Sequence, residues 1–176
     1  RERRERKGEE AGEGESRGMP MLVIHDSNST YIGAEVVPGK GVNEYAVRRL
    51  AQIVNRLGYR RVIIKSYQEP SIMALKAAVE RELELEVSFE ESPVGEHQSN
   101  GEIENEIKRM QGQVRTLRDA LESRIGERIK GEDHVFTWLV RLAAASMNRY
   151  QVGKDGRTAH ERLRGGKFRR DIAEFG

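Results

Sequence analysis

The chain alternates short apolar segments of two periodicities, and their order restricts the fold more than any other feature. Runs in which apolar residues are consecutive or alternate are typical of strands, and recurrence every three or four positions is typical of helices. The succession β–β–α–β–α–β–α–α predicts a mixed sheet flanked by helices. We expect strands at 21–25, 31–37, 61–65 and 85–89, and helices from 43 or 44 to 57 and at 71–83, 99–124 and 134–150.

Composition excludes several classes of protein. The 176 residues are enough for one domain with its own core. There is no Cys, which excludes disulfides, thiolate zinc sites and Cys nucleophiles, and the four His are not in zinc-ligand spacing. No apolar run approaches the roughly 20 residues of a membrane span, and no signal peptide is present. We therefore expect a soluble intracellular protein. The first residue is Arg rather than Met, which indicates a fragment, a processed product or a truncated gene.

Charge divides the chain into three parts. Residues 1–18 hold six basic and six acidic side chains and almost no apolar residue, which predicts a disordered charged arm. Residues 19–150 form the expected core, and residues 151–176 a basic C-terminal extension. Residues 101–176 hold sixteen basic and twelve acidic side chains, so this half is the expected partner of a polyanion. Residues 141–176 hold nine basic and four acidic side chains, with Phe168 among them. They form either a phosphate-binding segment or a charged tail.

The helix expected at 99–124 carries a polar row beside its apolar stripe. Ser99 and Glu102 fit a capping box at its start. The apolar stripe is Ile103, Ile107, Met110, Val114, Leu117 and Leu121, and the row one step round is Glu104, Lys108, Gln111, Arg115 and Arg118. A phosphate backbone laid along this row would pass Glu104 in the first turn. The alternative is a solvated face on which Glu104 and Lys108 form an ordinary i, i+4 ion pair.

Four segments resemble the catalytic cores of integrases from retroviruses and long-terminal-repeat retrotransposons. Asn100-Gly101-Glu102-Ile103-Glu104 is similar to the Asn-Gly-x-x-Glu motif that supplies the third carboxylate of that family's Asp-Asp-Glu triad. Residues 21–38 resemble the second and third strands of these cores, and residues 62–70 the fourth strand with its Asp-bearing loop. Residues 153–165 look like the Thr-Pro-x-Glu region beyond the last helix. The resemblance covers residues 19–176.

The resemblance implies a ribonuclease H-like α/β fold and metal-dependent DNA strand transfer. In that chemistry two Mg²⁺ or Mn²⁺ ions about 4 Å apart stabilise an in-line attack on a phosphodiester, and three carboxylates hold the ions. It makes Glu104 the catalytic, metal-binding residue. The implied partner is DNA, both the ends of the mobile element and the target DNA. The implied location is the nucleus, if the protein is functional. It implies DNA contacts by Asn100, Lys108, Gln111, Arg115 and Arg118.

The same resemblance predicts a broken metal site. Tyr67 stands where the family has its second Asp, and a phenol with a pKa of about 10 is neutral at pH 7. Glu69 is close, but its conformation is restricted by Pro70. The nearest candidate for the first Asp is Asp26. It stands in the predicted turn 26–30, and Asp is a common turn residue, so its presence there needs no catalytic explanation. No strand precedes Met19, so the first strand of the fold is missing and two inner strand edges lose their partners.

We therefore predict that strand transfer is absent or severely reduced. The alternative is a non-catalytic DNA-binding or oligomerising remnant of a mobile element, and a third possibility is a product that does not fold stably. His97 is either a surface residue or a DNA contact. Trp138 is expected on the core face of the helix at 134–150; in the family related helices form a dimer interface, so a homodimer is a second expectation.

Overall fold

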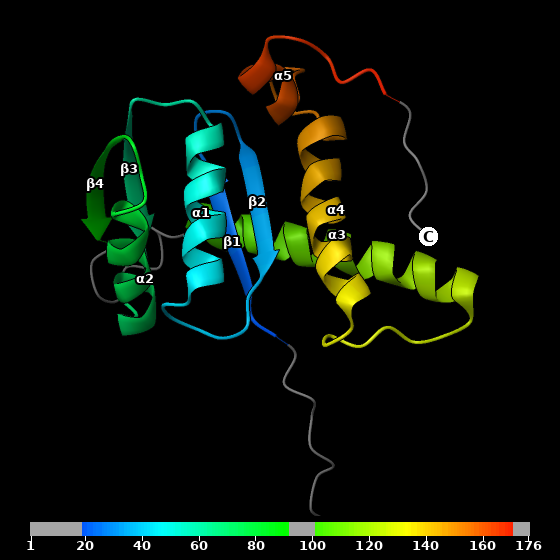
Figure 1. The fold of residues 1–176 in the computed structure, drawn as a ribbon. Helices are drawn as coiled ribbons and strands as arrows, with labels where there is room; N and C mark the ends of the chain where they lie inside the picture. The colour runs from blue at the N-terminus through cyan, green and yellow to red at the C-terminus, as the bar shows by residue number, and fades with distance from the viewer. Residues whose placement is uncertain (1–18, 92–100, 171–176) are drawn as a thin grey trace, which may run out of the picture.

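The computed structural model describes residues 19–91 and 101–170, and the predicted arm at 1–18 lies outside them. Figure 1 shows a mixed α/β arrangement in which short strand pairs are covered by helices. The strands are β1 (Met21–Asp26), β2 (Tyr31–Val36), β3 (Arg61–Ser66) and β4 (Glu86–Glu91). The helices are α1 (Glu44–Arg56), α2 (Pro70–Glu80), α3 (Gly101–Ile125), α4 (His134–Tyr150) and α5 (Ala159–Arg164). The expected order of elements is confirmed up to α4, and α5 was not expected.

Local sequence signals explain most of these boundaries. The Asn43 side chain accepts a hydrogen bond from the Ala46 N–H at 2.8 Å and caps α1. Gly58, with a φ of 76°, follows that helix in a conformation that glycine adopts without strain. The helix that the sequence predicted at 71–83 begins one residue earlier, at Pro70. Its N-cap is Glu69, because Pro70 lacks an N–H and suits the first helical position.

The strands form two separate two-stranded sheets rather than one. β1 pairs antiparallel with β2, and β3 pairs parallel with β4. Within residues 19–91 and 101–170, no strand bridges β1 and β3, so one edge of each lacks a strand partner. The expected mixture of strand directions is therefore present, but the single mixed sheet that we expected is not formed by the described residues.

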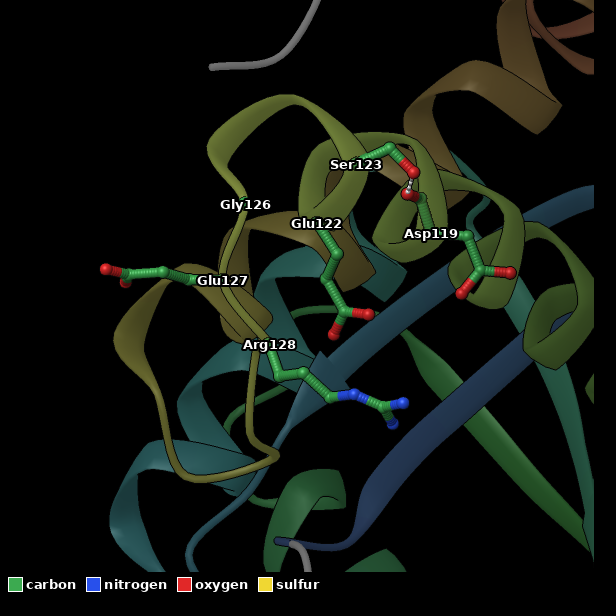
Figure 2. A pocket seen from close by; sticks show the side chains of 6 residues that line it. All are labelled: Asp119, Glu122, Ser123, Gly126, Glu127 and Arg128. Atoms are coloured by element: carbon green, nitrogen blue, oxygen red, sulfur yellow. Dashed lines mark hydrogen bonds between the residues drawn. The ribbon is translucent and has the colours of Figure 1, made fainter.

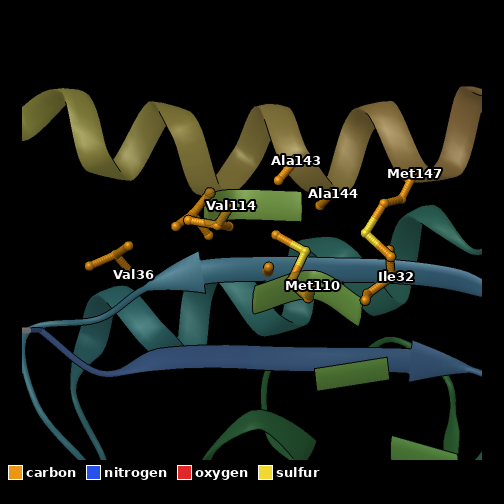
Figure 3. Close-up of a cluster of buried hydrophobic side chains, with 9 residues drawn as sticks. Ile32, Val36, Met110, Val114, Ala143, Ala144 and Met147 are labelled. Atoms are coloured by element: carbon orange, nitrogen blue, oxygen red, sulfur yellow. The ribbon is translucent and has the colours of Figure 1, made fainter. Parts of the chain in front are cut away.

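The main core lies between β2, α3 and α4. Its members are apolar residues from the three elements (Figure 3): Ile32, Ala34, Val36, Met110, Val114, Val140, Ala143, Ala144 and Met147. A second cluster joins α1 and α2 around Ala46, Leu75 and Val79. Burial of α3 follows the predicted stripe at Met110, Val114 and Leu121. The helix–helix and helix–sheet contacts therefore follow the apolar periodicity.

One prediction about the core is wrong. Trp138 is 60% exposed on α4, and the guanidinium of Arg141 lies 5.8 Å from its ring centroid. Leu139, the next residue, which the sequence pattern placed on the same core face, is fully buried. Both side chains fit an apolar helical pattern, and only the direction from which α3 approaches α4 decides between them. Among the helices that the structure describes, none has the length and apolarity needed to cross a bilayer.

Candidate functional site

The structure brings Glu104 and Tyr67 together. Glu104 lies in the first turn of α3, and Tyr67 follows directly after β3. The Tyr67 hydroxyl donates a hydrogen bond to Glu104 Oε1 at 2.7 Å, across 37 positions of sequence. The first turn of α3 is thus tied to the carboxyl end of β3, at the place where the resemblance expected two carboxylates.

This pair is not a set of metal ligands. Burial, together with the hydrogen bond and negative charge of Glu104, raises the pKa of Tyr67 to about 12. The phenol is therefore a neutral donor at pH 7, whereas Mg²⁺ and Mn²⁺ require anionic or carbonyl oxygens. Within residues 19–91 and 101–170, no three His, Asp or Glu side chains are placed to hold a metal ion. The described residues here do not fit the two metal ions of integrase chemistry.

Glu69 is engaged elsewhere. Its Oε1 accepts a hydrogen bond from Ser71 at 2.9 Å and forms an ion pair with Lys40 at 3.2 Å. Hydrogen bonds from Ser71 and Lys40, with the charge of Lys40, lower the pKa of Glu69. Its carboxylate thus fastens the start of α2 to the loop before α1.

Asp26 is the last residue of β1 rather than a turn residue, but its side chain serves the turn to β2, where its sequence position placed it. Its Oδ2 accepts hydrogen bonds from the Ser29 N–H at 3.0 Å and the Tyr59 hydroxyl at 2.8 Å. Burial raises the pKa of Asp26, but these hydrogen bonds outweigh it and the pKa is lowered. The carboxylate therefore holds the hairpin turn and the segment before β3.

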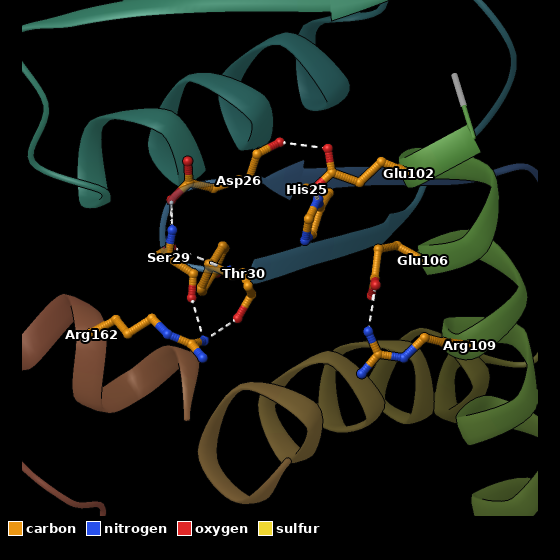
Figure 4. Close-up of polar contacts among 10 residues, drawn as sticks. His25, Asp26, Ser29, Thr30, Glu102, Glu106, Arg109 and Arg162 are labelled. Atoms are coloured by element: carbon orange, nitrogen blue, oxygen red, sulfur yellow. Dashed lines mark hydrogen bonds and ion pairs between the residues drawn. The ribbon is translucent and has the colours of Figure 1, made fainter. Parts of the chain in front are cut away.

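A second contact of α3 was not predicted. Glu102 accepts a hydrogen bond from the Ser27 hydroxyl at 2.8 Å and lies 3.4 Å from Nδ1 of His25 (Figure 4). Glu102 thus fixes the start of α3 to the end of β1, while Glu104 fixes it to β3. No periodicity in the sequence indicates such a contact, because it depends on how two distant elements meet.

The predicted polar row of α3 is present in part. Lys108, Gln111 and Arg115 are exposed. Arg118 instead pairs with Glu122 at 2.8 Å, and Glu122 also accepts the Ile129 N–H at 2.8 Å. Within the described residues, Glu104 and Lys108 form no ion pair, because Glu104 is bonded to Tyr67. Asn100, Ser99 and His97 lie outside the described residues.

A shallow pocket lies at the far end of α3. Figure 2 shows its lining: Asp119, Glu122, Ser123, Gly126, Glu127 and Arg128. Glu122 is already engaged by Arg118 and by the Ile129 N–H, which holds its pKa below the ordinary value. The Ser123 hydroxyl is engaged as well, since it donates a hydrogen bond to the Asp119 carbonyl at 2.8 Å, so we do not take this pocket as a candidate site.

Comparison with solved structures shows the class of fold. The chain is similar to the crystal structure of the catalytic core domain of BIV integrase, with a TM-score of 0.52 and 18% sequence identity. The match covers 81% of this chain and 84% of that chain. No family model matches the chain, and no curated protein matches it in sequence. The structure therefore has an integrase-core-like fold, and the likeness extends to the fold alone.

The Tyr67–Glu104 hydrogen bond predicts an unusual tyrosine titration. The pKa of Tyr67 in the folded chain exceeds the ordinary value of about 10. Protonated Tyr67, favoured by burial and by its bond to Glu104, therefore contributes stability that is fully present below pH 10 and is lost as the pH rises through about 12. Selective ¹³Cζ-tyrosine NMR should show Tyr67 still protonated at pH 11, and ionising closer to pH 10 in Glu104→Gln. An unchanged titration in that variant would rule out the bond in solution.

Proposed function

We propose that this chain is an integrase-type core, of the kind found in retroviruses and long-terminal-repeat retrotransposons, that binds DNA but has lost strand-transfer activity. The integrase-core-like fold supports the first part. The observation that carries the second part is the hydrogen bond from the Tyr67 hydroxyl to Glu104. In this proposal the Tyr67 phenol stands where the resemblance expects a second carboxylate, and it engages Glu104, the residue that the resemblance matches to the third.

Loss of activity follows from what in-line phosphodiester chemistry requires. Two cations must stabilise the attacking and leaving oxygens, and carboxylates from separate elements must hold them. Here Asp26 serves the hairpin turn and Glu69 serves the start of α2. A single Glu beside a neutral phenol does not neutralise the charge of two divalent ions, so we expect no stable binding of Mg²⁺ or Mn²⁺.

DNA binding is supported by the exposed part of the α3 row. Lys108, Gln111 and Arg115 are exposed on one side of the helix beyond Glu104. Basic and amide side chains in a row suit contacts with successive phosphates, which supply affinity without reading sequence. Such binding needs no metal and weakens linearly in log affinity with log salt. These two properties separate it from catalysis.

The decisive experiment is an incubation of end-labelled duplex DNA with the protein in Mn²⁺, beside the Glu104→Gln variant. We expect no nicked or joined product from either protein, and a salt-sensitive mobility shift from both. Products that depend on metal and vanish in Glu104→Gln would contradict the loss of activity. Absence of any shift, for wild type as for variant, would contradict DNA binding.

Replacing Tyr67 by Asp should create a weak cation site. The substitution removes the donor bonded to Glu104 and places a second carboxylate on the strand end beside it. Isothermal titration with Mn²⁺ should detect binding to Tyr67→Asp and none to wild type. Tyr67→Asn is the matched control, since it has nearly the same shape without the charge. Equal Mn²⁺ binding by the Asp and Asn variants would mean that side chains at positions 67 and 104 do not bind one cation together.

Two features support the proposal that this chain associates with itself: the separation of the strands into two sheets, and the exposure of Trp138. Among the described residues, one edge of β1 and one edge of β3 have no strand partner, and unpaired edges invite association. Trp138 is a large apolar side chain of the sort enriched at interfaces. We expect sedimentation to show a concentration-dependent dimer that Trp138→Ala weakens about tenfold or more, the loss typical of an interface hot spot. If Trp138→Ala associates as strongly as wild type, this face of α4 is not the interface.

A further inference from the structure

Seven exposed basic residues lie at the end of α4, on α5 and in the segments on either side of α5: Lys154 and the six that are named below. Among the residues described, none of the six forms an ion pair with a carboxylate. We name them the C-terminal basic surface: Arg149, Arg157, Arg164, Lys167, Arg169 and Arg170.

Two acidic residues lie among the described residues that follow α4, Asp155 and Glu161, and both are already engaged. Asp155 forms an ion pair with Arg162 and accepts the Arg157 N–H at 3.1 Å. These contacts lower its pKa to about 2, with the Arg162 hydrogen bond as the largest cause. Glu161 belongs to the capping box of α5 and accepts the Thr158 N–H at 2.8 Å. The charges of Lys167 and Arg157 also act on Glu161 and help to lower its pKa, after its hydrogen bonds with Thr158. Cations still outnumber carboxylates among the described residues of this region, so it presents net positive charge.

Phe168 holds the segment after α5 in place. Its ring lies 4.4 Å from the guanidinium of Arg149 and makes edge contacts with Tyr150 at 5.8 Å and His160 at 5.3 Å. The Tyr150 hydroxyl donates to the carbonyl of Arg170 at 3.2 Å. The cations of this segment are therefore held on the surface of α4 and α5. Binding an anion then costs less ordering entropy than it would on a free tail.

We propose that the C-terminal basic surface binds the phosphate backbone of duplex DNA without reading its bases. Exposed guanidinium and ammonium groups without carboxylate partners are the side chains that neutralise phosphates. Phe168 already has Arg149 over its ring and T-shaped contacts with Tyr150 and His160, so we take it as an internal anchor rather than a platform for stacked bases. This surface does not include α3, which carries the row of the proposed function. The two proposed surfaces share only their ligand, DNA.

The test compares two triple variants of equal charge by fluorescence anisotropy with a short duplex over a range of salt. One is Lys167→Gln, Arg169→Gln and Arg170→Gln, which leaves the Arg170 carbonyl available to Tyr150. The control is Arg56→Gln, Arg60→Gln and Arg81→Gln, three exposed arginines elsewhere. The first triple should weaken binding ~10-fold or more near 0.1 M salt and reduce the slope of log affinity against log salt by about 2–3. The control triple should change both far less.

Equal losses in the two triples would overturn the proposal, because only net charge would then matter. Phe168→Ala should also weaken binding although it changes no charge, and unchanged affinity would remove the anchoring role. Duplexes rich in A·T and in G·C should bind alike. A strong preference between them would overturn backbone-only recognition. Tighter binding to vesicles of anionic lipid than to DNA, abolished by the first triple, would assign the surface to membranes instead.

The same assay separates this proposal from the α3 row. A loss with Lys108→Gln and Arg115→Gln but none with the C-terminal triple would overturn the inference and leave the proposed function standing. A loss confined to the C-terminal triple would support the inference and remove the α3 row as a DNA contact. No DNA binding by the wild-type chain would overturn both.

Discussion

Glu35→Ala should destabilise the fold by about 3 kcal/mol, because it removes the one carboxylate at a buried junction of three elements. The Glu35 side chain on β2 is 4% exposed. It accepts hydrogen bonds from Arg49 Nε at 2.9 Å, from Arg141 Nε at 2.9 Å and from the Tyr45 hydroxyl at 3.1 Å. The variant leaves two guanidinium groups of α1 and α4 without a counter-charge. They keep some access to water, so the low end of the range for broken buried pairs applies.

Chemical denaturation checks this prediction. Against a total stability of about 5–15 kcal/mol, such a loss is a large fraction. Glu86→Ala is the matched control, because Glu86 also pairs with an arginine, Arg61 at 2.9 Å, but on the surface. An exposed pair contributes less than about 1 kcal/mol. If Glu35→Ala costs no more than Glu86→Ala, the junction is not a stabilising centre.

Asn148→Ala should cost about 2–4 kcal/mol, since it leaves two buried backbone groups without partners. Asn148 lies on α4 and is 8% exposed. Its Oδ1 accepts the Ile32 N–H at 2.8 Å, and its Nδ2 donates to the Ile32 carbonyl at 2.7 Å. One side chain therefore satisfies the outer edge of β2 where no strand pairs with it in the described part of the chain.

Hydrogen exchange gives a residue-specific readout of this bond. The Ile32 amide should be protected in wild type and exchange much faster in Asn148→Ala, beyond the general loss of stability. Asn105→Ala, at an exposed position of α3, should leave both stability and exchange nearly unchanged. Full protection of Ile32 in Asn148→Ala would mean that another group covers this edge.

The elements themselves could be predicted where the pattern was long and periodic. The helix expected at 134–150 is α4 with the same limits, and the hairpin of β1 and β2 lies where the apolar runs and the turn at 26–30 placed it. The short helix α5 was missed because six residues are too few to show a period. Its capping box, Thr158 with Glu161, was the signal that could have revealed it.

The candidate site could be predicted only through resemblance. The likeness to integrase cores paired Tyr67 with Glu104, and their side chains do meet. No local pattern connects Glu102 with His25 and Ser27, or Glu35 with Arg49 and Arg141, since these contacts join residues brought together by packing.

The sequence by itself determined the order and type of the main elements, because strand and helix periodicities are local properties of adjacent residues. It also determined which parts of the chain are basic, since the order of basic and acidic residues fixes the charge of each segment. Only the tertiary structure decided that the strands form two sheets, that Trp138 is exposed, and that Glu104 accepts a hydrogen bond from a phenol. Those features depend on how elements that are distant in sequence pack together. Adjacent residues of a helix point in different directions, so a small rotation of the helix about its axis changes which side chain is buried.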